Sequence, residues 1–379
     1  MFTETATSDR RTGLRRRLLA SPLAQALTTP HGVDRYVELV KPVFSLRDVR
    51  AEIVAVRRAT PGSVTLELRP NENWQGFRAG QHVRLSIEID GVRHTRPYSP
   101  AGSEHDPRLV ELTAHAQPDG RVSPHLRTRL VPGDVVGLSQ AEGDFALPAA
   151  RPRELLLISG GSGITPVMAM LRTLCDEGHD GPIAFLHYAP SERHVAYASE
   201  LRALADAHPN VRLLRGYTRV GGLGGGELSG RFGREHVDAA RVDLAAAETY
   251  VCGPTALVES VHALWADDGL EERLHVERFV APAPLLVPDD ADDATATGTL
   301  RFARSGVEVT GRGGTLLDQA EAAGLSPQNG CRMGICHTCS CRKLEGAVRD
   351  IRTGEISTAP DQQIQICVTA PVGDVTIDI

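Results

Sequence analysis

Four cysteines near the C-terminus constrain the fold of this chain more than any other feature. Cys331, Cys336 and Cys339 follow the spacing C-x4-C-x2-C, and 27 residues separate Cys339 from Cys367. The chain has seven cysteines, and an odd number is poor evidence for a framework of disulfides. We therefore expect reduced thiols that bind a metal centre, in a protein of the reducing cytoplasm.

This spacing is typical of plant-type ferredoxins, in which four thiolates hold a [2Fe-2S] cluster. Three cysteines on a loop that also contains Gly330 and Gly334 can wrap a small cluster, and a neighbouring segment supplies the fourth. A tetrahedral zinc site is the competing interpretation. Zinc ribbons usually present two C-x2-C pairs, whereas this chain has one. We predict a [2Fe-2S] cluster on Cys331, Cys336, Cys339 and Cys367.

The chain is too long for one ordinary domain, and its patterns change along its length. Alternating runs such as 83–89 predict an antiparallel β-barrel, and later runs that alternate strand, glycine turn and helix predict a doubly wound parallel α/β domain. A proline- and aspartate-rich stretch precedes the last block, which we expect to be an α+β domain of the β-grasp type. The expected parts are a leader (1–45), the β-barrel (46–150), the α/β domain (151–281), a linker (282–298) and the ferredoxin-like domain (299–379).

The overall composition excludes some classes of function. The net charge of −7 gives no reason to expect nucleic-acid binding. No apolar run approaches the roughly 18 residues that a membrane helix requires. We expect a protein that does not span the membrane, and the sequence leaves its oligomeric state open.

Two short motifs in the β-barrel block suit a flavin. They are Arg96-Pro97-Tyr98-Ser99 and Gly120-Arg121-Val122-Ser123. An aromatic ring can lie on an isoalloxazine, an arginine can bind a pyrophosphate with two hydrogen bonds, and a serine can bond a ring nitrogen. The second motif precedes a helix-like segment, 124–130, whose N-terminal amides can hold phosphate. Taken alone, the first motif is more simply a strand end and a turn.

Together these motifs resemble the flavin-binding pair of the ferredoxin-NADP reductase superfamily. The resemblance implies FAD rather than FMN, because the second motif is similar to that of the FAD-binding branch. It assigns to the flavin Arg96, Pro97, Tyr98, Ser99, Gly120, Val122 and Ser123.

A glycine-rich turn, Gly160 to Pro166, lies between an expected strand and an expected helix, where backbone amides can bind a pyrophosphate. With Cys252-Gly253-Pro254, it resembles the nicotinamide domain of the same superfamily. The resemblance places Cys252 and Thr165 beside the nicotinamide, so that Cys252, Ser99 and Thr165 form the reacting site. Cys252 is otherwise a small buried residue at a strand end. The nucleotide residues are Gly160, Gly161, Gly163, Thr165, Pro166, Cys252, Gly253 and Pro254.

The residues after the next two strands bear on the choice of nucleotide. Ser191 and Arg193 follow one strand, and Thr218, Arg219 and Arg231 follow the next. Thr218-Arg219 resembles the pair that holds the 2′-phosphate in NADP-specific relatives, so we expect NADPH. Glu192 leaves NADH open, because an acid in this region can bind the ribose hydroxyls.

The tripeptide Glu277-Arg278-Phe279 also matches this family, in which it often precedes the linker. From that position Phe279 can approach the flavin. Ordinary packing of this side chain is an equally good interpretation.

The order of the domains implies an NAD(P)H-dependent oxidoreductase, in which electrons pass from NADPH to FAD, to [2Fe-2S] and to an external acceptor. It resembles reductase components of oxygenases, hydroxylases and desaturases, and most of all actinobacterial reductases that serve a membrane-bound di-iron fatty acyl desaturase. Docking on a membrane-bound partner would follow. The alternatives are an aromatic-ring or alkane hydroxylase, a cytochrome P450 and a hybrid-cluster protein as acceptor. A redox sensor without turnover is a hypothesis of another class.

Overall fold

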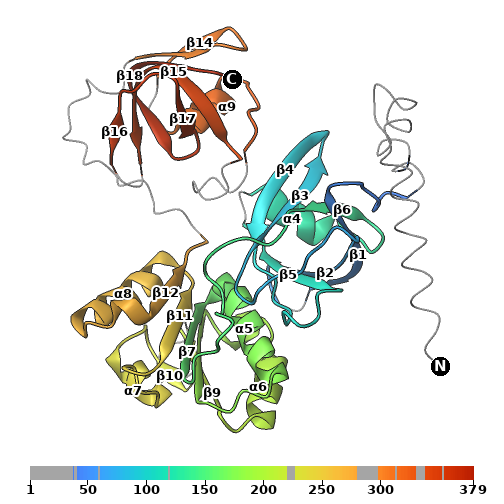
Figure 1. Cartoon of the computed structure of the whole chain (residues 1–379), viewed down its shortest axis with the longest axis vertical. Helices are drawn as coiled ribbons and strands as arrows, with labels where there is room; N and C mark the ends of the chain where they lie inside the picture. Colours follow the sequence, from blue (N-terminus) through green and yellow to red (C-terminus); the bar gives the residue numbers. More distant parts are fainter. Residues whose placement is uncertain are drawn as a thin grey trace.

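The computed structural model describes residues 37, 41–58, 60–117, 120–219, 227–279, 298–311, 314–329, 338–351 and 354–379. Its strands form three six-stranded sheets, which occupy successive parts of the chain (Figure 1). Within the described residues, no helix is long and apolar enough to cross a membrane.

The first sheet is antiparallel and has the strand order β4-β3-β6-β1-β2-β5. Residues of strand 83–89 alternate between buried and less buried positions, as the sequence predicts for a barrel wall. The elements are β1 (Val49–Arg57), β2 (Ser63–Pro70), β3 (Val83–Ile89), β4 (Val92–Tyr98), β5 (Val110–His115), α4 (Val122–Thr128) and β6 (Val135–Leu138). The helix α4 begins two residues earlier than expected, at Val122, because Val122 and Leu126 pack on the barrel core.

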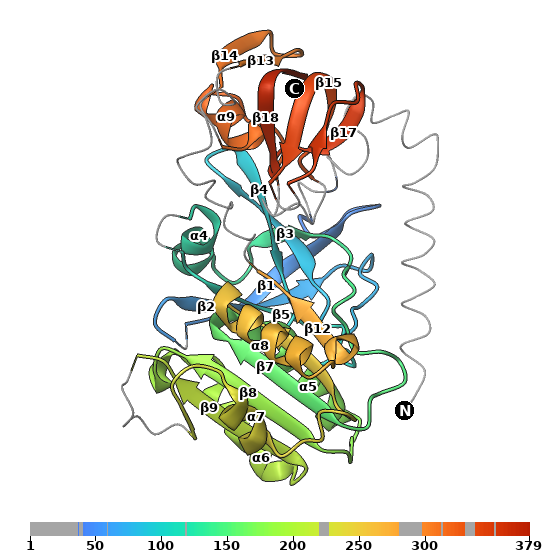
Figure 2. The ribbon, with the colours of Figure 1, turned by 90° about the vertical axis from the view of Figure 1, so that its left-hand side faces the viewer.

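The second sheet is parallel, with the order β10-β9-β8-β7-β11-β12. Its strands are β7 (Leu155–Gly160), β8 (Ile183–Ala189), β9 (Val211–Tyr217), β10 (Leu228–Ser229), β11 (Glu248–Cys252) and β12 (Leu274–Glu277). Its helices are α5 (Ile164–Asp176), α6 (Ala198–Ala207), α7 (Arg234–Ala240) and α8 (Thr255–Asp267). Helices α5 and α6 cover one face, and α7 and α8 cover the other (Figure 2). The doubly wound fold is therefore confirmed.

The third sheet is mixed and carries one helix, as expected for a β-grasp domain. Its order is β14-β13-β18-β15-β16, with β17 paired to β15. The elements are β13 (Thr299–Phe302), β14 (Val307–Thr310), α9 (Leu316–Ala322), β15 (Ser340–Asp350), β16 (Ile356–Ser357), β17 (Gln362–Gln365) and β18 (Thr369–Ile377). Helix α9 begins at a capping box, in which the Thr315 hydroxyl accepts from Asp318 N and the Asp318 carboxylate accepts from Thr315 N.

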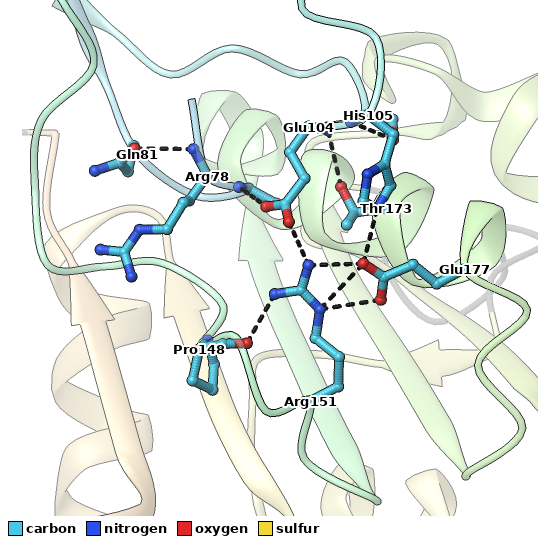
Figure 3. A network of polar contacts seen from close by, with 10 residues as sticks. Arg78, Gln81, Glu104, His105, Pro148, Arg151, Thr173 and Glu177 are labelled. Atoms are coloured by element: carbon cyan, nitrogen blue, oxygen red, sulfur yellow. Dashed lines mark hydrogen bonds and ion pairs between the residues drawn. The ribbon is translucent and has the colours of Figure 1, made fainter. Parts of the chain in front are cut away.

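A polar network joins the first two sheets (Figure 3). Arg151, in the connection between them, forms ion pairs with Glu104 of the barrel side and with Glu177 at the end of α5. Glu104 also accepts from Ala79 N (2.6 Å), and its own N–H donates to Thr173 Oγ1 (3.1 Å). The hydrogen bonds from Arg151 lower the pKa of Glu177 to about 2, so this carboxylate is charged at any physiological pH.

Candidate flavin, nucleotide and cluster sites

The two nucleotide motifs predicted from the sequence lie against each other. Strands β7 and β11 are neighbours, and they pair Cys252 with Ser159, the residue before the glycine turn. A Cβ on Gly163 would lie 2.2 Å from the carbonyl oxygen of Cys252, and one on Gly160 would lie 2.8 Å from Pro254 Cδ. The glycines are therefore required for this close approach of two backbones.

Burial governs the chemistry of Cys252 and Thr165. Cys252 is fully buried, and burial, together with Glu277, raises its thiol pKa well above the usual range. Thr165 is also buried, and its hydroxyl lies 3.3 Å from Ser162 O in the same turn. Cys252 thus carries a neutral thiol on a residue whose backbone lies against the turn, which suits a group that packs beside a nicotinamide.

A pH dependence follows from this thiol. Because the pKa of Cys252 is raised, the protonated form persists as pH rises, and no thiolate forms between about pH 6 and 9. We expect the ratio of flavin reduction rates between the unaltered protein and a Cys252→Ala variant to stay constant over that range, when measured by anaerobic stopped flow. A ratio that changes with an inflection near pH 8 would contradict a neutral Cys252.

Three residues near Cys252 were not predicted from the sequence to belong to the site. Strand pairing aligns Glu277, Cys252, Ser159 and His187 in one row across the carboxyl ends of four neighbouring strands. Ser159 Oγ lies 2.8 Å from His187 Nδ1, and burial lowers the pKa of His187 to about 4, so the imidazole is neutral. Only Glu277 had a signal in the sequence, its place in the tripeptide 277–279.

The flavin motif ends β4, at the edge of the first sheet. Tyr98 packs partly against the barrel core, and burial, opposed by Arg96, raises its pKa to about 12. Ser99 is 1% exposed, and its hydroxyl has no hydrogen-bond partner among the described residues. Burying a hydroxyl without a hydrogen-bond partner costs free energy, unless a bound ligand supplies the partner. Ser99 therefore fits the expected contact with a flavin.

The second flavin motif lies at the start of α4. Ser123 Oγ accepts from Gln117 N (3.0 Å), and Gly120 N donates to Gln117 O (3.0 Å), which forms a compact turn. Val122 packs on the same barrel core as Tyr98. Strand β5, which pairs with the residue after Ser99, also lies against the glycine turn of the second sheet. The flavin motif and the nucleotide motif therefore flank the same strand.

The loops predicted to select the nucleotide come together at the carboxyl ends of the parallel strands. Thr218 N donates to Ala189 O (2.9 Å) and Arg219 N donates to Pro190 O (3.1 Å), which joins the loops after β8 and β9. Ser191 Oγ bonds His194 Nδ1 (2.8 Å). Arg193 lies in the same turn, and Arg231 follows β10, which pairs with β9. Glu192 is within 4 Å of Arg202 and of Arg215.

Two of the four cluster cysteines lie in the described residues, and both are buried in the same core of the third sheet. Cys339 is 2% exposed and Cys367 is 5% exposed. Ile366 N donates to Cys339 O (3.3 Å), which holds the two segments side by side. Cys331 and Cys336 lie outside the described residues. Two adjacent buried thiols fit a cluster ligand set.

Phe279 is the last described residue before the linker region, and it packs against the core that contains Cys252 and Phe145. This contact is compatible with ordinary packing of Phe279, and the approach of its side chain to a flavin stays a prediction.

Comparisons with known proteins agree with this arrangement. Models of an oxidoreductase FAD-binding domain, an oxidoreductase NAD-binding domain and a 2Fe-2S iron-sulfur cluster binding domain match residues 59–147, 157–263 and 301–372. An NADPH oxidoreductase of Mycobacterium tuberculosis is 37% identical over 363 residues, covering 94% of this chain and 91% of the relative. A glycine betaine monooxygenase reductase subunit of Pseudomonas aeruginosa is 30% identical, with coverages of 80% and 87%.

Among solved structures, phthalate dioxygenase reductase has the same fold, with a TM-score of 0.60 at 20% identity and coverages of 87% of this chain and 97% of that one. The fold, the site and these matches define an oxidoreductase that binds FAD, a pyridine nucleotide and a [2Fe-2S] cluster. The chain belongs to the ferredoxin-NADP reductase superfamily, as a member with a C-terminal [2Fe-2S] domain.

Proposed function

We propose that this protein takes a hydride from NADPH and delivers the electrons singly, through its cluster, to an external acceptor. The contact between the glycine turn and Cys252, with β5 of the barrel alongside, carries this proposal, because it brings the nucleotide motifs next to the flavin side. When bound, FAD accepts the electron pair and the [2Fe-2S] cluster passes on one electron at a time.

The chain's own residues would have these roles. Ser99, Thr165 and Cys252 orient the two rings, and the neutral form of Cys252 packs beside the nicotinamide without reacting with it. Arg96 and the turn at Gly120 would hold the flavin pyrophosphate. Cys331 and Cys336 would complete the ligand set of Cys339 and Cys367. We place the domain limits at 46–150, 151–281 and 299–379, with the protein in a reducing cytoplasm.

The preference for NADPH rests on Arg219. Backbone hydrogen bonds hold Thr218 and Arg219 against the loop that follows β8, at the carboxyl ends of β8 and β9. The adenosine part of the nucleotide would lie there. The relative from Mycobacterium tuberculosis is named an NADPH oxidoreductase, which supports the same nucleotide here.

Removing the Arg219 guanidinium should therefore change the preference between NADPH and NADH. We expect Arg219→Ala to raise the NADPH Michaelis constant by about tenfold to a hundredfold, because a hydrogen bond to a charged phosphate contributes roughly 1.5 to 3 kcal/mol. The NADH constant should change far less. Arg153→Ala is the matched control, since Arg153 is exposed at the amino end of the same sheet. Equal rises for both nucleotides would refute the role of Arg219.

We propose an oxygenase or a desaturase as the acceptor. The glycine betaine monooxygenase reductase subunit and the stachydrine N-demethylase reductase subunit are 30% and 27% identical to this chain, which supports a terminal oxygenase as the wider class. A membrane di-iron fatty acyl desaturase is our specific proposal, and a hydroxylase, a cytochrome P450 or a hybrid-cluster protein is the alternative.

A reconstitution separates these acceptors. Cells that naturally produce the protein are separated into membranes and soluble extract. The purified reductase and NADPH are mixed with each fraction, and NADPH oxidation that depends on an acceptor is measured in both. We expect oxidation with membranes that requires a fatty acyl substrate. Oxidation with the soluble extract alone would exclude a membrane desaturase. Absence of NADPH-dependent reduction of any dye would instead favour a sensor.

A further inference from the structure

Arg172, in the middle of α5, makes an unusually complete set of contacts with three different segments. Its Nη1 donates to Ala101 O (2.7 Å) and to Glu111 Oε1 (2.7 Å) of the barrel domain. Its Nε and Nη2 each bond a carboxylate oxygen of Glu200 on α6 at 2.7 Å. The side chain is only 15% exposed. A planar guanidinium is suited to such a set, because its donors point in fixed directions.

An aromatic side chain completes the cluster. The guanidinium carbon of Arg172 lies 4.9 Å from the centre of the Tyr197 ring, and the Tyr197 hydroxyl bonds Thr113 Oγ1 on β5. Tyr197 has φ 61°, in the left-handed region that residues other than glycine adopt only when surrounding contacts hold them there. Tyr197 precedes α6 directly and ends the loop that contains Ser191 and Arg193.

Each segment that Arg172 contacts leads to part of the proposed site. Ala101 is two residues beyond Ser99, and its N–H donates to Glu111 O (2.8 Å). Thr165 lies seven residues before Arg172 in the same helix, roughly 10 Å along its axis. One guanidinium thus holds three segments in place relative to one another. They are the segment after Ser99, the helix that begins next to the glycine turn with Thr165, and the loop that contains Ser191 and Arg193. The network around Arg151 (Figure 3) holds the far end of α5 in the same way.

We propose that Arg172 is a positioning residue for hydride transfer, which holds the flavin and nicotinamide sites at reacting distance before the nucleotide binds. The inference rests on the proposed function of Ser99 and Thr165. Hydride transfer is sensitive to such placement, because a displacement of about 1 Å can reduce a rate about a hundredfold. A residue that only stabilises the fold would change unfolding temperature without a comparable change in this rate.

The test compares Arg172→Met and Arg172→Lys with the unaltered FAD-containing protein. The limiting rate of flavin reduction by NADPH is measured by anaerobic stopped flow, together with FAD content, the unfolding temperature and the dissociation constant of NADP+. We expect Arg172→Met to lose about tenfold to a hundredfold in rate, with a change below about threefold in the dissociation constant. Arg172→Lys should be intermediate, because lysine keeps the charge but not the planar fork.

Arg273→Met is the matched control, since the ion pair of Arg273 with Glu248 lies within the nucleotide domain and joins nothing to the barrel. It should leave the rate unchanged. A rate within about twofold of normal in Arg172→Met, at a lowered unfolding temperature, would overturn the proposal. Should Arg172→Met not fold with FAD, Glu111→Gln replaces it, and the same loss or retention of rate decides. If the unaltered protein itself shows no flavin reduction by NADPH, the proposed function fails rather than the role of Arg172.

Discussion

Replacing Cys339 with serine should abolish electron delivery to a protein acceptor while leaving the flavin reaction intact. Cys339 and Cys367 are both buried, and a backbone hydrogen bond joins their segments, so Cys339→Ser removes one of the four predicted thiolate ligands of the cluster. We expect NADPH-dependent reduction of cytochrome c to fall below about a tenth of normal. Replacing a residue that only hydrogen-bonds a metal ligand already lowers metal affinity or activity about tenfold or more, and here a ligand itself is lost. FAD content and reduction of small dyes should be retained. Iron and sulfide analysis reports the loss of the cluster.

Cys341→Ser is the matched control for this variant. Cys341 lies two residues away, in β15, and the spacing of the motif does not require it as a ligand. It should retain iron and cytochrome c reduction. Normal iron content and normal cytochrome c reduction in Cys339→Ser would contradict the proposed ligand set.

A methyl group on Gly163 should have the second large effect, on the flavin reaction itself. Its Cβ would lie 2.2 Å from Cys252 O and 2.7 Å from Gly253 N, and both are backbone atoms that cannot rotate away. The turn and the strand end must therefore separate. We expect Gly163→Ala to lower the rate of flavin reduction by NADPH about a hundredfold, because the nicotinamide would be displaced from the flavin.

Gly102→Ala provides the comparison, because a Cβ on Gly102 would meet no atom within 4 Å. This variant should reduce its flavin at the normal rate. FAD content measured for both variants separates a displaced nucleotide site from a lost flavin. An unchanged rate in Gly163→Ala would show that the two motifs do not meet as described.

The local features of the fold were predictable because short-range rules determine them. The capping box at the start of α9, for example, joins Thr315 to Asp318, only three residues away in the sequence. The glycine turn and Cys252 were also predictable as partners, because each motif is short and follows a strand. The ligand roles of Arg96, Ser191 and Arg231 stay predictions.

The contacts of Arg172 were not predictable. Its partners in the barrel, Ala101 and Glu111, lie 71 and 61 residues away in the sequence. In an amphipathic helix, a single arginine among apolar residues is typical of a solvent-facing position, and nothing local distinguishes this one. The row that aligns Glu277, Cys252, Ser159 and His187 likewise depends on the register of parallel strands, which a single sequence does not reveal.

The central claim is the order NADPH, FAD, [2Fe-2S]. The most direct test is to mix the oxygen-free protein with one equivalent of NADPH and to follow flavin absorbance and the electron paramagnetic resonance of the reduced cluster in time. We predict that flavin absorbance falls first and that the cluster signal rises afterwards, and that Cys339→Ser shows only the first change. A cluster signal that precedes the change in flavin absorbance, or that never forms in the unaltered protein, would contradict this order.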